Sequence, residues 1–465
     1  MEIPAQHVHF IGIGGAGLSA IARVLMEQGA EVSGSDVVLS PVAEALARDG
    51  AHVFASHRAE NVAGAELVVV SSAVPPDNVE VQAARAAGIR VLKRPEFLGQ
   101  MMDGHLGVAV AGTHGKTTTT AMIASILLEA GCDPTFVVGG VIAGLGTNAR
   151  AGGGSLFVIE ADEYNRTFLS LTPQVAVVTI IEHDHPDCYP TFAGFQAAFE
   201  EFVALLPGDG LLLTGWDDPV ARGLGERRRA TGSAVTFFGL EKGAEWRAEG
   251  LRSNFAGGVD FLAVHADEVL GLVRLRVPGA HNASNAMAAL AVAGFLDIPF
   301  RVARIALTEF RGVGRRFEVK GDAGGVIVVD DYAHHPTEIR VTLAAARQRF
   351  PDRSLWVVWQ PHTYSRTKTL MGDFVQAFVM ADHVIVLPIY AAREIDTLGI
   401  SSADVVAAMR HPDVRCAGSL DEAMVWLGTE VRHGDVVLTL GAGDGYRVGE
   451  WLLKVLGNES MTNGK

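Results

Sequence analysis

Short runs of β-branched and other apolar residues alternate with longer stretches of helical periodicity along the whole chain. Strand-like apolar runs lie at residues 7–13, 30–36, 65–74, 105–112, 324–331, 354–361, 383–390 and 435–444. The stretch at 18–29, after the first run, has the pattern of an amphipathic helix. Strand-length runs that alternate with helix-length segments are typical of parallel sheets covered by helices. The pattern therefore predicts an α/β fold.

The length and the joints between these series predict the domain organisation. A chain of 465 residues is too long for one hydrophobic core and suggests about three domains of ordinary size. Candidate joints lie near residues 101–105 and 310–318, where the second joint is rich in Gly and Arg. We expect domains at residues 1–103, 104–314 and 315–465.

Composition narrows the classes of partner. The chain is 49% hydrophobic and 20% charged, and 53 acidic against 38 basic residues give a net charge of −15. This acidic balance argues against nucleic acid or an anionic membrane as the main partner. The first residues have no signal-peptide pattern, and no apolar run approaches the roughly 18 residues that a membrane span needs. We expect a cytoplasmic protein whose three cysteines, Cys132, Cys188 and Cys416, serve packing.

The segment at 108–131 nearly matches the phosphate-binding pattern G-x-x-x-x-G-K-[ST], but Val110 stands where the first glycine belongs. An apolar run ends in Gly112-Thr-His-Gly-Lys116-Thr117 and passes directly into a helical pattern. Backbone N–H groups at such a turn can face a polyphosphate, with the lysine on its outer phosphates and the threonine hydroxyl on Mg²⁺. The alternative is an ordinary turn with a solvated lysine. Four consecutive threonines at the start of a helix weigh against it, because β-branched residues are mediocre helix formers.

A second glycine motif lies near the N-terminus. Gly12, Gly14 and Gly17 satisfy G-x-G-x-x-G between a strand and a helix, and Asp36 ends the next strand. By itself this is the dinucleotide fingerprint, which indicates NAD. The glycine turn and the acid require only a diphosphate beside a sugar, so a nucleotide diphosphate-sugar could bind to the same residues. A tight turn without a ligand is the third interpretation.

Acids and histidines follow two predicted strands of the middle domain. They are Glu160, Asp162 and Glu163 after one strand, and His183, Asp184, His185 and Asp187 after the other. In a phosphate-loop domain, acids at strand ends hold the Mg²⁺ of the nucleotide. The letters HDHPDC also come within one residue of H-x-H-x-D-H, a binuclear zinc hydrolase pattern, with Cys188 at the last position. A polar turn that caps a helix remains a further alternative.

The last part of the chain adds polar groups at the starts of helices and the ends of strands. They are His281, Asn282 and Asn285, then Arg315 and Arg316, and finally Asp331, His334, His335, His362 and Arg366. The asparagines can cap a helix or pair with an adenine edge. The arginines can stabilise phosphate charge or form a solvated surface pair. Strand ends of an open parallel sheet line a ligand crevice, so we expect the last group to converge on one site.

Taken together and in this order, the motifs resemble the Mur ligases of peptidoglycan synthesis over nearly the whole chain. The segments that carry the resemblance are HFIGIGGAGLSAIA, GSD, SSAV, AGTHGKTTTT, GLGTNA, EADE, GAHNASNAMAA, GVGRRFE, DDYAHHPTE and QPHTYSRT. The resemblance implies a Rossmann-like N-terminal domain, a central P-loop ATPase-like domain and a Rossmann-like C-terminal domain. The phosphate loop of this family has the form GTHGKT, so Val110 is no defect.

The resemblance also implies an activity, in which ATP drives the joining of L-alanine to the lactyl carboxylate of UDP-N-acetylmuramate through an acyl phosphate. Two Mg²⁺ ions, which Mn²⁺ can replace, would assist the reaction. The expected partners are these three small molecules, with no nucleic acid and no membrane, and the enzyme would be a monomer or a homodimer.

Site residues follow from the resemblance position by position. It assigns to ATP Gly112, Thr113, His114, Gly115, Lys116, Thr117, Thr118, His281, Asn282, Asn285, Arg316 and Asp331. To the UDP-sugar it assigns Gly14, Gly15, Ala16, Gly17, Ser19, Asp36, Ser71, Ser72 and Asn148. The amino acid would meet Tyr332, His362 and Arg366, and the metal Thr117, Glu160 and His185. The catalytic set would be Lys116, Glu160, His185, Arg316, His334, His335 and Arg366.

Three positions depart from the usual family pattern and leave alternatives open. Ile180 replaces an asparagine near the metal, Thr363 replaces an arginine near the amino acid, and Tyr164 resembles a related ligase that recycles murein tripeptide. No lysine occurs between Lys116 and Lys242, which separates the chain from relatives that use a carbamylated lysine. The recycling ligase is the main rival within the family. An NAD-dependent oxidoreductase and a nucleotide sensor without catalysis are the rivals outside it.

Overall fold

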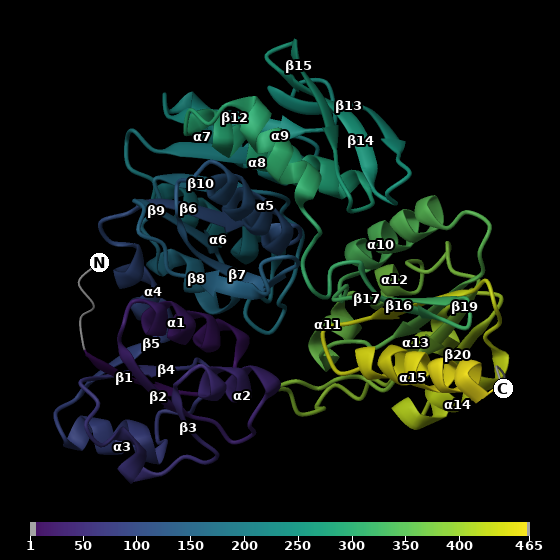
Figure 1. The fold of residues 1–465 in the computed structure, drawn as a ribbon, viewed down its shortest axis with the longest axis horizontal. Coiled ribbons are helices and arrows are strands. Elements are labelled where there is room, and N and C mark those ends of the chain that lie inside the picture. The colour runs from purple at the N-terminus through teal and green to yellow at the C-terminus, as the bar shows by residue number, and fades with distance from the viewer. Residues whose placement is uncertain (1–5, 463–465) are drawn as a thin grey trace.

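The computed structural model describes residues 6–462 and contains three sheets that follow one another along the chain (Figure 1). The first sheet has the order β3-β2-β1-β4-β5, and all its strands are parallel. Its elements are β1 (His7–Ile11), α1 (Ala16–Glu27), β2 (Glu31–Ser35), α2 (Pro41–Arg48), β3 (His52–Phe54), η1 (Ala59–Val62), β4 (Leu67–Val70), α3 (Val79–Ala86), β5 (Arg90–Lys93) and α4 (Arg94–Met102). This sheet is the N-terminal domain.

The central domain has ten strands in the order β15-β14-β13-β12-β11-β10-β6-β9-β7-β8. Its first half comprises β6 (Leu106–Ala111), α5 (Lys116–Glu129), β7 (Thr135–Ile142), β8 (Thr147–Arg150), β9 (Leu156–Glu160), η2 (Tyr164–Ser170), β10 (Val175–Val178) and α6 (Phe192–Ala204). Its second half comprises β11 (Leu211–Gly215), α7 (Pro219–Ala230), β12 (Ala234–Gly239), β13 (Trp246–Ser253), β14 (Val259–His265), β15 (Glu268–Arg274), α8 (Ala280–Phe295) and α9 (Phe300–Glu309).

The C-terminal domain has six strands in the order β16-β17-β21-β18-β19-β20. Its elements are β16 (Glu318–Ala323), β17 (Val326–Asp331), α10 (Pro336–Arg349), β18 (Leu355–Trp359), α11 (Tyr364–Thr369), α12 (Met371–Phe374), β19 (His383–Val386), α13 (Ser402–Ala408), β20 (Val414–Cys416), α14 (Leu420–Glu430), β21 (Val436–Leu440) and α15 (Tyr446–Thr462). The α/β fold with three domains is therefore confirmed.

The apolar pattern had predicted parallel sheets, but two of the three sheets also contain antiparallel pairs. The pairs β7–β8, β13–β14, β14–β15 and β16–β17 are antiparallel. Each pair joins strands that are adjacent in sequence through a short turn, which parallel pairing cannot do because it needs a long crossover. The antiparallel strands lie toward the edges of the central and C-terminal sheets, and two of them, β8 and β17, carry expected site residues, Asn148 and Asp331.

The two domain interfaces differ in character. One continuous hydrophobic core runs from α1 and β1 into the central domain, where it includes Phe168, Phe195, Phe199 and Phe202. The C-terminal domain has cores of its own, which hold no residue of the central domain. Polar side chains make its contacts with the central domain, as described below. Since ionic contacts rearrange in water more readily than a shared core, we expect the C-terminal domain to be the part that moves.

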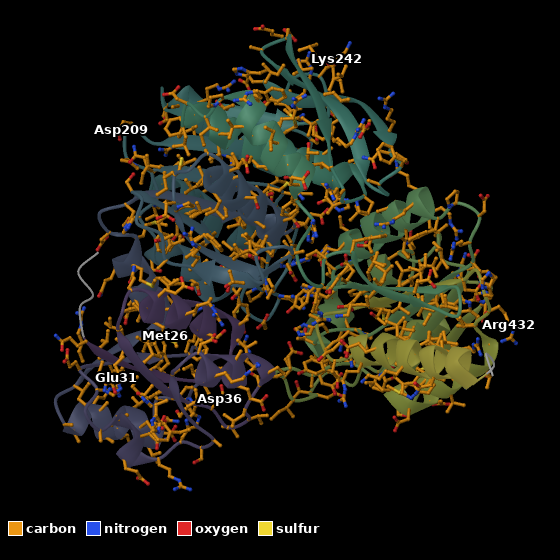
Figure 2. The ribbon with its side chains drawn as sticks, in the orientation of Figure 1. Met26, Glu31, Asp36, Asp209, Lys242 and Arg432 are labelled. Carbon is orange, nitrogen blue, oxygen red and sulfur yellow. The ribbon has the colours of Figure 1, made fainter. Side chains whose placement is uncertain are left out.

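Charged side chains cover the outside of all three domains (Figure 2). Lys242, the first lysine after Lys116, lies on the outer part of the central domain, away from both neighbouring domains. No helix in the described part of the chain is both long and apolar enough to cross a membrane.

Candidate active site

The phosphate loop connects β6 to α5 at the centre of the molecule. Gly112 has φ +130° and Gly115 has φ +81°, a region that favours glycine over residues with a side chain. A Cβ atom at Gly115 would also lie 2.6 Å from Oδ1 of Asn285 on α8. The threonines that open α5 are buried, since the helix packs between the sheet and the helices α8 and α9. The glycines therefore allow the backbone conformation of the turn, and the packing of α5 buries the threonines that follow it.

A cavity of about 550 Å³ lies beside this loop. Nine residues expected at ATP line it: His114, Gly115, Thr117, Thr118, His281, Asn282, Asn285, Arg316 and Asp331. The sequence interpretation missed several other lining residues, among them Glu182, Asp218, Phe238, Leu240 and Glu338. Phe238 and Leu240 lie at the end of β12, and nothing in their sequence distinguishes them from ordinary strand residues.

Lys116 is held by partners on the protein. Its Nζ lies 2.5 Å from the carbonyl of Gly112 and 2.9 Å from Oε1 of Glu163, whose side chain is 1% exposed. Burial opposes the charge of Lys116, but Glu163 and Glu160 outweigh it and raise the pKa of the lysine. Oε2 of Glu163 is buried without a hydrogen-bond partner. A buried carboxylate oxygen of this kind is a free ligand atom next to a charged lysine.

The residues expected to hold a metal offer suitable donors. Oγ1 of Thr117 donates to Oε1 of Glu160 over 3.0 Å, and the backbone N–H of Gly139 donates to Oε2 over 2.7 Å. Burial raises the pKa of Glu160 despite Lys116 nearby. Carboxylate and hydroxyl oxygens are what Mg²⁺ prefers, and a cation would offset the burial of this carboxylate.

His185 contacts Glu163, whereas His183 does not. Nε2 of His185 is 3.3 Å from Oε1 of Glu163, and the residue has φ +53°, which is unusual for a side chain of this size. Nε2 of His183 bonds to the carbonyl of Tyr189, over 2.8 Å. The two histidines of HDHPDC therefore have separate partners, and the arrangement does not support the zinc hydrolase alternative.

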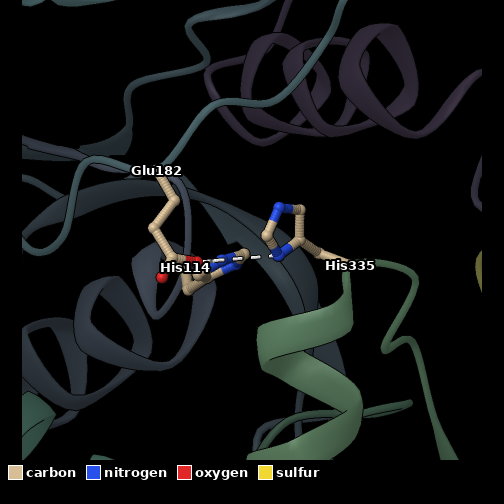
Figure 3. A group of neighbouring side chains, drawn as sticks. All are labelled: His114, Glu182 and His335. Carbon is tan, nitrogen blue, oxygen red and sulfur yellow. Dashed lines mark hydrogen bonds and ion pairs between the residues drawn. The ribbon is translucent and has the colours of Figure 1, made fainter. Parts of the chain in front are cut away.

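His114 links the phosphate loop to the C-terminal domain. Its Nε2 lies 2.9 Å from Oε2 of Glu182, and both lie beside His335 of the C-terminal domain (Figure 3). Its Nδ1 lies 3.2 Å from Oε1 of Glu338 on α10. Burial lowers the pKa of His114, but the two carboxylates outweigh it and raise the value to about 9. The side chain is an imidazolium at neutral pH, shared between two carboxylates of different domains.

His335 completes this group but does not make it a convincing metal centre. The ligand atoms of His114, Glu182 and His335 lie within 4.8 Å of one another, the one such set of His, Cys, Asp and Glu side chains within residues 6–462. Nδ1 of His335 accepts the backbone N–H of Thr337 over 3.3 Å, at the start of α10. Since His114 carries a proton and His335 caps a helix, an ionic contact between domains explains the set without a metal ion.

Arg316 and Asp331 bring the C-terminal domain to the cavity. Nη2 of Arg316 lies 3.4 Å from Oγ1 of Thr117, and its Nη1 lies 3.6 Å from Oε1 of Glu338. Burial raises the pKa of Asp331 to about 6 although Arg316 opposes the shift. The ring of Tyr332 lies 5.2 Å from the guanidinium carbon of Arg316. One cation thus faces the phosphate loop from across the domain boundary.

The histidines of this edge are neutral at pH 7. Burial lowers the pKa values of His334 and His335 to about 4 each. Nδ1 of His334 bonds to the carbonyl of Tyr332 over 2.9 Å, while Nε2 of His335 is buried without a partner. The ring of His362 lies 5.7 Å from that of His334. The expected convergence of these strand ends is therefore seen in the structure.

Arg366 has partners on two domains. Its Nε donates to Oδ1 of Asp184 over 2.7 Å, its Nη1 lies 2.9 Å from Nδ1 of His362, and its Nη2 lies 3.4 Å from Nδ1 of His185. The arginine is 3% exposed. That Arg366 also binds the amino acid stays a prediction. In this structure its guanidinium nitrogens already have partners on the protein. Asp184 was expected among the acids at a strand end, and its pairing with Arg366 was not predicted.

The N-terminal fingerprint faces the central domain. Oδ2 of Asp36 accepts the backbone N–H of Gly14 over 2.9 Å. A second cavity of about 200 Å³ is lined by Ala16 and Gly17 on one side and by Glu160 on the other. A missed residue, Arg94, lies between them: its Nη1 is 2.1 Å from where a Cβ of Gly17 would be. No sequence signal marked Arg94, since it precedes Pro95 at an ordinary helix start.

The other residues expected at the UDP-sugar have varied surroundings. Ser19 is buried and donates to the carbonyl of Ala16 inside α1, and Ser72 is exposed. Oγ of Ser71 accepts the N–H of Ala73, and Asn148 lies on β8, which packs against α1. Ser19 therefore has a partner within its own helix, whereas Asn148 lies at the interface of the two domains.

Comparisons with known proteins agree with this geometry. Residues 7–106 match the model of the Mur ligase family catalytic domain, residues 110–293 the Mur ligase middle domain, and residues 315–443 the Mur ligase glutamate ligase domain. The chain belongs to the Mur ligase family. A Mur ligase is an ATP-dependent enzyme that joins an acid to an amino acid, so the chain is an enzyme of this class. The expected resemblance is confirmed.

Individual Mur ligases are similar over nearly the full length. A UDP-N-acetylmuramate–L-alanine ligase of Desulfosudis oleivorans is 44% identical and covers 97% of this chain and 99% of its own. The ligase of the same name from Solibacter usitatus is 46% identical, and the match covers 98% of this chain and 96% of that protein. The structure of UDP-N-acetylmuramate–alanine ligase from Thermotoga maritima matches with a TM-score of 0.81 at 28% identity, over 99% of this chain and 100% of that one. The structure of a murein peptide ligase from Psychrobacter arcticus matches with a TM-score of 0.73 at 26% identity, and the match covers 97% of this chain and 99% of that one.

Proposed function

We propose that this Mur ligase joins L-alanine to the lactyl carboxylate of UDP-N-acetylmuramate at the expense of ATP. The observation that carries the proposal is the similarity of 44 to 46% over nearly the whole chain to ligases named for this reaction. The lactyl carboxylate attacks the γ-phosphate of ATP, ADP leaves, and the amine of alanine then displaces phosphate from the acyl phosphate.

Charge neutralisation is the main task in the first step, because the transferring phosphoryl group spreads negative charge over its oxygens. Lys116 would exchange Glu163 and the loop carbonyls for the β- and γ-phosphates. Arg316, which faces Thr117 from the C-terminal domain, would meet the same charge. The adenine would lie near Asn285 and His281, and the ribose near Asp331, all of which line the larger cavity.

Thr117, Glu160 and His185 would hold Mg²⁺, with the free oxygen of Glu163 as a further donor. The ion would supply charge stabilisation at the phosphates. The chain's own part is to hold these donors fixed: Gly139 orients Glu160, and Arg366 lies against His185.

The second step needs a neutral amine. His334 and His335 are neutral at pH 7, so each is able to accept a proton from the ammonium group of alanine. Nδ1 of His335 accepts the N–H of Thr337, so its ring proton lies on Nε2, whereas Nδ1 of His334 donates to the carbonyl of Tyr332 and leaves Nε2 able to accept a proton. This tautomer favours His334 over His335 for this step. The amino acid would bind between Tyr332, His362 and Arg366. The diphosphate of the UDP-sugar would lie along Gly14–Gly17, beside Asp36, Ser71 and Ser72, with Asn148 across the domain interface.

A phosphate-release assay tests the proposal. Purified enzyme with ATP, Mg²⁺ and UDP-N-acetylmuramate is supplied in turn with L-alanine, L-serine, glycine and the murein tripeptide, and with no amine. We expect the highest kcat/KM with L-alanine. Release that depends on the tripeptide and not on alanine would favour the recycling ligase instead.

The fingerprint at the N-terminus gives a second test, directed at the oxidoreductase alternative. A ligand that binds only the folded state raises the melting temperature. UDP-N-acetylmuramate should stabilise the protein and NAD should not, with Gly14→Val as the control that blocks the loop beside Asp36. Stabilisation by NAD alone would contradict the assignment.

A further inference from the structure

A buried carboxylate lies next to the strand that supports the glycine turn of the N-terminal domain. It belongs to Glu80, near the start of α3, whose side chain is fully buried. Its Oε2 accepts the hydroxyl of Ser35 over 2.5 Å, and its Oε1 accepts Nδ2 of Asn61 over 2.5 Å and the backbone N–H of Arg58 over 3.3 Å. Burial raises the pKa of Glu80, but His9 and these side-chain donors outweigh it and lower the value to about 2. The group is therefore an anion at neutral pH.

Two histidines complete the surroundings of this carboxylate. Nδ1 of His57 lies 2.9 Å from Oγ of Ser35 and 3.2 Å from Oε2 of Glu80. Because the one hydroxyl proton of Ser35 is donated to the carboxylate, Nδ1 of His57 carries a proton of its own. Nε2 of His9 lies 3.8 Å from the same Oε2, and its Nδ1 bonds to Oγ of Ser33 over 2.8 Å. Each hydrogen-bonded neighbour of the carboxylate is thus a donor.

Ser35 joins the buried carboxylate to the glycine turn. Its carbonyl accepts the N–H of Gly12 over 2.8 Å and the N–H of Ile13 over 3.1 Å. The next residue, Asp36, accepts the N–H of Gly14 through Oδ2 over 2.9 Å. One residue therefore has its side chain bound to the carboxylate and its backbone bound to the turn, so a movement of the first displaces the second.

The carboxylate lies on the face of the sheet that is turned away from α1. Phe10 on β1 packs in one core with α1, whereas Ile11 packs in another with Val81 of α3. The two helices therefore cover opposite faces of the first sheet (Figure 1). The glycine turn leads directly into α1. Since Glu80 is fully buried on the α3 face, it can act on a ligand of the turn through Ser35 and not by contact.

We propose that Glu80 is a positioning residue for the UDP-sugar, which holds the glycine turn and Asp36 in their binding conformation through Ser35. The inference rests on the proposed function, because it takes the UDP-sugar as the ligand of that turn. A site whose groups are fixed before the ligand arrives avoids the cost of ordering them on binding. Loss of the carboxylate should therefore weaken binding of the UDP-sugar and leave the chemical step and the other two substrates unchanged.

Glu80→Gln tests this role with little change in volume. Both carboxylate oxygens accept from donors, so the amide nitrogen of a glutamine faces a donor whichever way the side chain turns. The KM for UDP-N-acetylmuramate should rise roughly tenfold, the lower end of the range for a lost charge-assisted hydrogen bond. The values of kcat and of the KM for ATP and L-alanine should stay within about twofold. An unchanged KM for the UDP-sugar would overturn the proposal.

Val81→Ala is the matched control for a role in stability alone. Val81 follows Glu80 on α3, is 3% exposed and has an apolar side chain. The substitution removes buried carbon atoms and should lower the melting temperature without changing the KM for the UDP-sugar. All variants are assayed well below the melting temperature of each. If Val81→Ala raised this KM as much as Glu80→Gln at an equal loss of melting temperature, the proposal would be overturned.

Ser35→Ala cuts the connection at its other end, because it removes the hydroxyl and keeps the carbonyl that binds the turn. It should raise the KM for UDP-N-acetylmuramate as Glu80→Gln does. The double variant Glu80→Gln/Ser35→Ala should be no worse than the more affected single variant, because both substitutions break the same link. Effects that multiply in the double variant would mean that the two residues act independently, which contradicts the proposal.

Binding measured without turnover separates this inference from the proposed function. Calorimetric titration with UDP-N-acetylmuramate, in the absence of ATP and L-alanine, should show an affinity roughly tenfold weaker for Glu80→Gln than for the unaltered enzyme. If the unaltered enzyme does not bind UDP-N-acetylmuramate, the proposed function fails before any variant is compared. If it binds and Glu80→Gln binds equally well, only the role of Glu80 fails.

Discussion

Nε of Arg366 donates to Oδ1 of Asp184 over 2.7 Å, and this pair joins two domains that share no hydrophobic core. Both side chains are about 5% exposed or less. Asp184 comes from the loop after β10, and Arg366 from α11, so the contact exists only while the C-terminal domain lies against the central one. This pair therefore marks the closed arrangement, in which the C-terminal domain contacts the central domain.

Asp184→Asn should open this arrangement. A buried arginine without its carboxylate costs about 3–5 kcal/mol, which the enzyme avoids by moving the C-terminal domain into water. We expect kcat to fall at least about tenfold, since Arg316 and the histidines leave the phosphate loop. Small-angle scattering should show a larger radius of gyration.

The control is Glu200→Gln, which breaks an exposed pair with Arg227 inside the central domain. Exposed pairs contribute about 0–1 kcal/mol, so this variant should keep both kcat and radius. An Asp184→Asn enzyme with normal kcat and an unchanged radius would show that the domains are held together by other contacts.

Lys116→Ala should abolish phosphate release and, in addition, destabilise the ligand-free protein. Besides its expected place on the nucleotide phosphates, the lysine neutralises Glu163, which is 1% exposed. Without the lysine, that buried carboxylate keeps only His185 as a partner, so the free energy of unfolding should fall by up to about 3–5 kcal/mol. Urea unfolding without ATP measures the loss.

The double variant Lys116→Ala/Glu163→Gln separates the two roles. It removes the unpaired charge, so most of the lost stability should return while activity stays absent. Recovery of activity in the double variant would mean that Lys116 acts only through Glu163 and not on the phosphates.

The sequence predicted what depends on local order. The GTHGKT turn, the strand ends and the helix starts are each set by neighbouring residues, and the resemblance then supplied the three-domain fold. Contacts between distant segments were not predictable in this way. Asp184 and Arg366 are 182 positions apart, and Arg94 meets Asp162 across a domain boundary. Glu338 was hidden for another reason: three residues after His335, it reads as an ordinary capping residue of α10, which it also is.

Glu338 should set the pKa of His114. In the folded protein that pKa is about 9, raised from 6.5 by Glu182 and Glu338 against the effect of burial. A raised value means that the imidazolium stabilises the folded, closed state. Its contribution is fully present below pH 6.5 and is lost as the pH rises through about 9. Scattering between pH 6 and 10 should therefore show opening above about pH 9.

NMR of the His114 ring, assigned with His114→Gln, measures the same property directly. In Glu338→Gln one of the two carboxylates is neutral, so the pKa of His114 should fall and the opening should shift to lower pH. A His114 that titrates near pH 6.5 in the unaltered enzyme would rule out the imidazolium between the two domains.

Arg94→Gln should weaken binding of the UDP-sugar. Arg94 lines the smaller cavity between Gly17 and Glu160, and its Nη2 lies 3.0 Å from Oδ2 of Asp162. A diphosphate on the Gly14–Gly17 turn would meet this guanidinium, and a lost charge-assisted contact costs about 1.5–3 kcal/mol. The KM for UDP-N-acetylmuramate should rise roughly ten- to a hundredfold while that for ATP stays within about twofold.

Arg85→Gln, at the exposed end of α3, is the matched control. Asp162→Asn removes the protein partner of Arg94 and leaves the arginine itself, so it should keep or lower the KM for the UDP-sugar. If both Arg94→Gln and Asp162→Asn raised that KM equally, the contact between the domains, and not the cation, would be what the substrate requires.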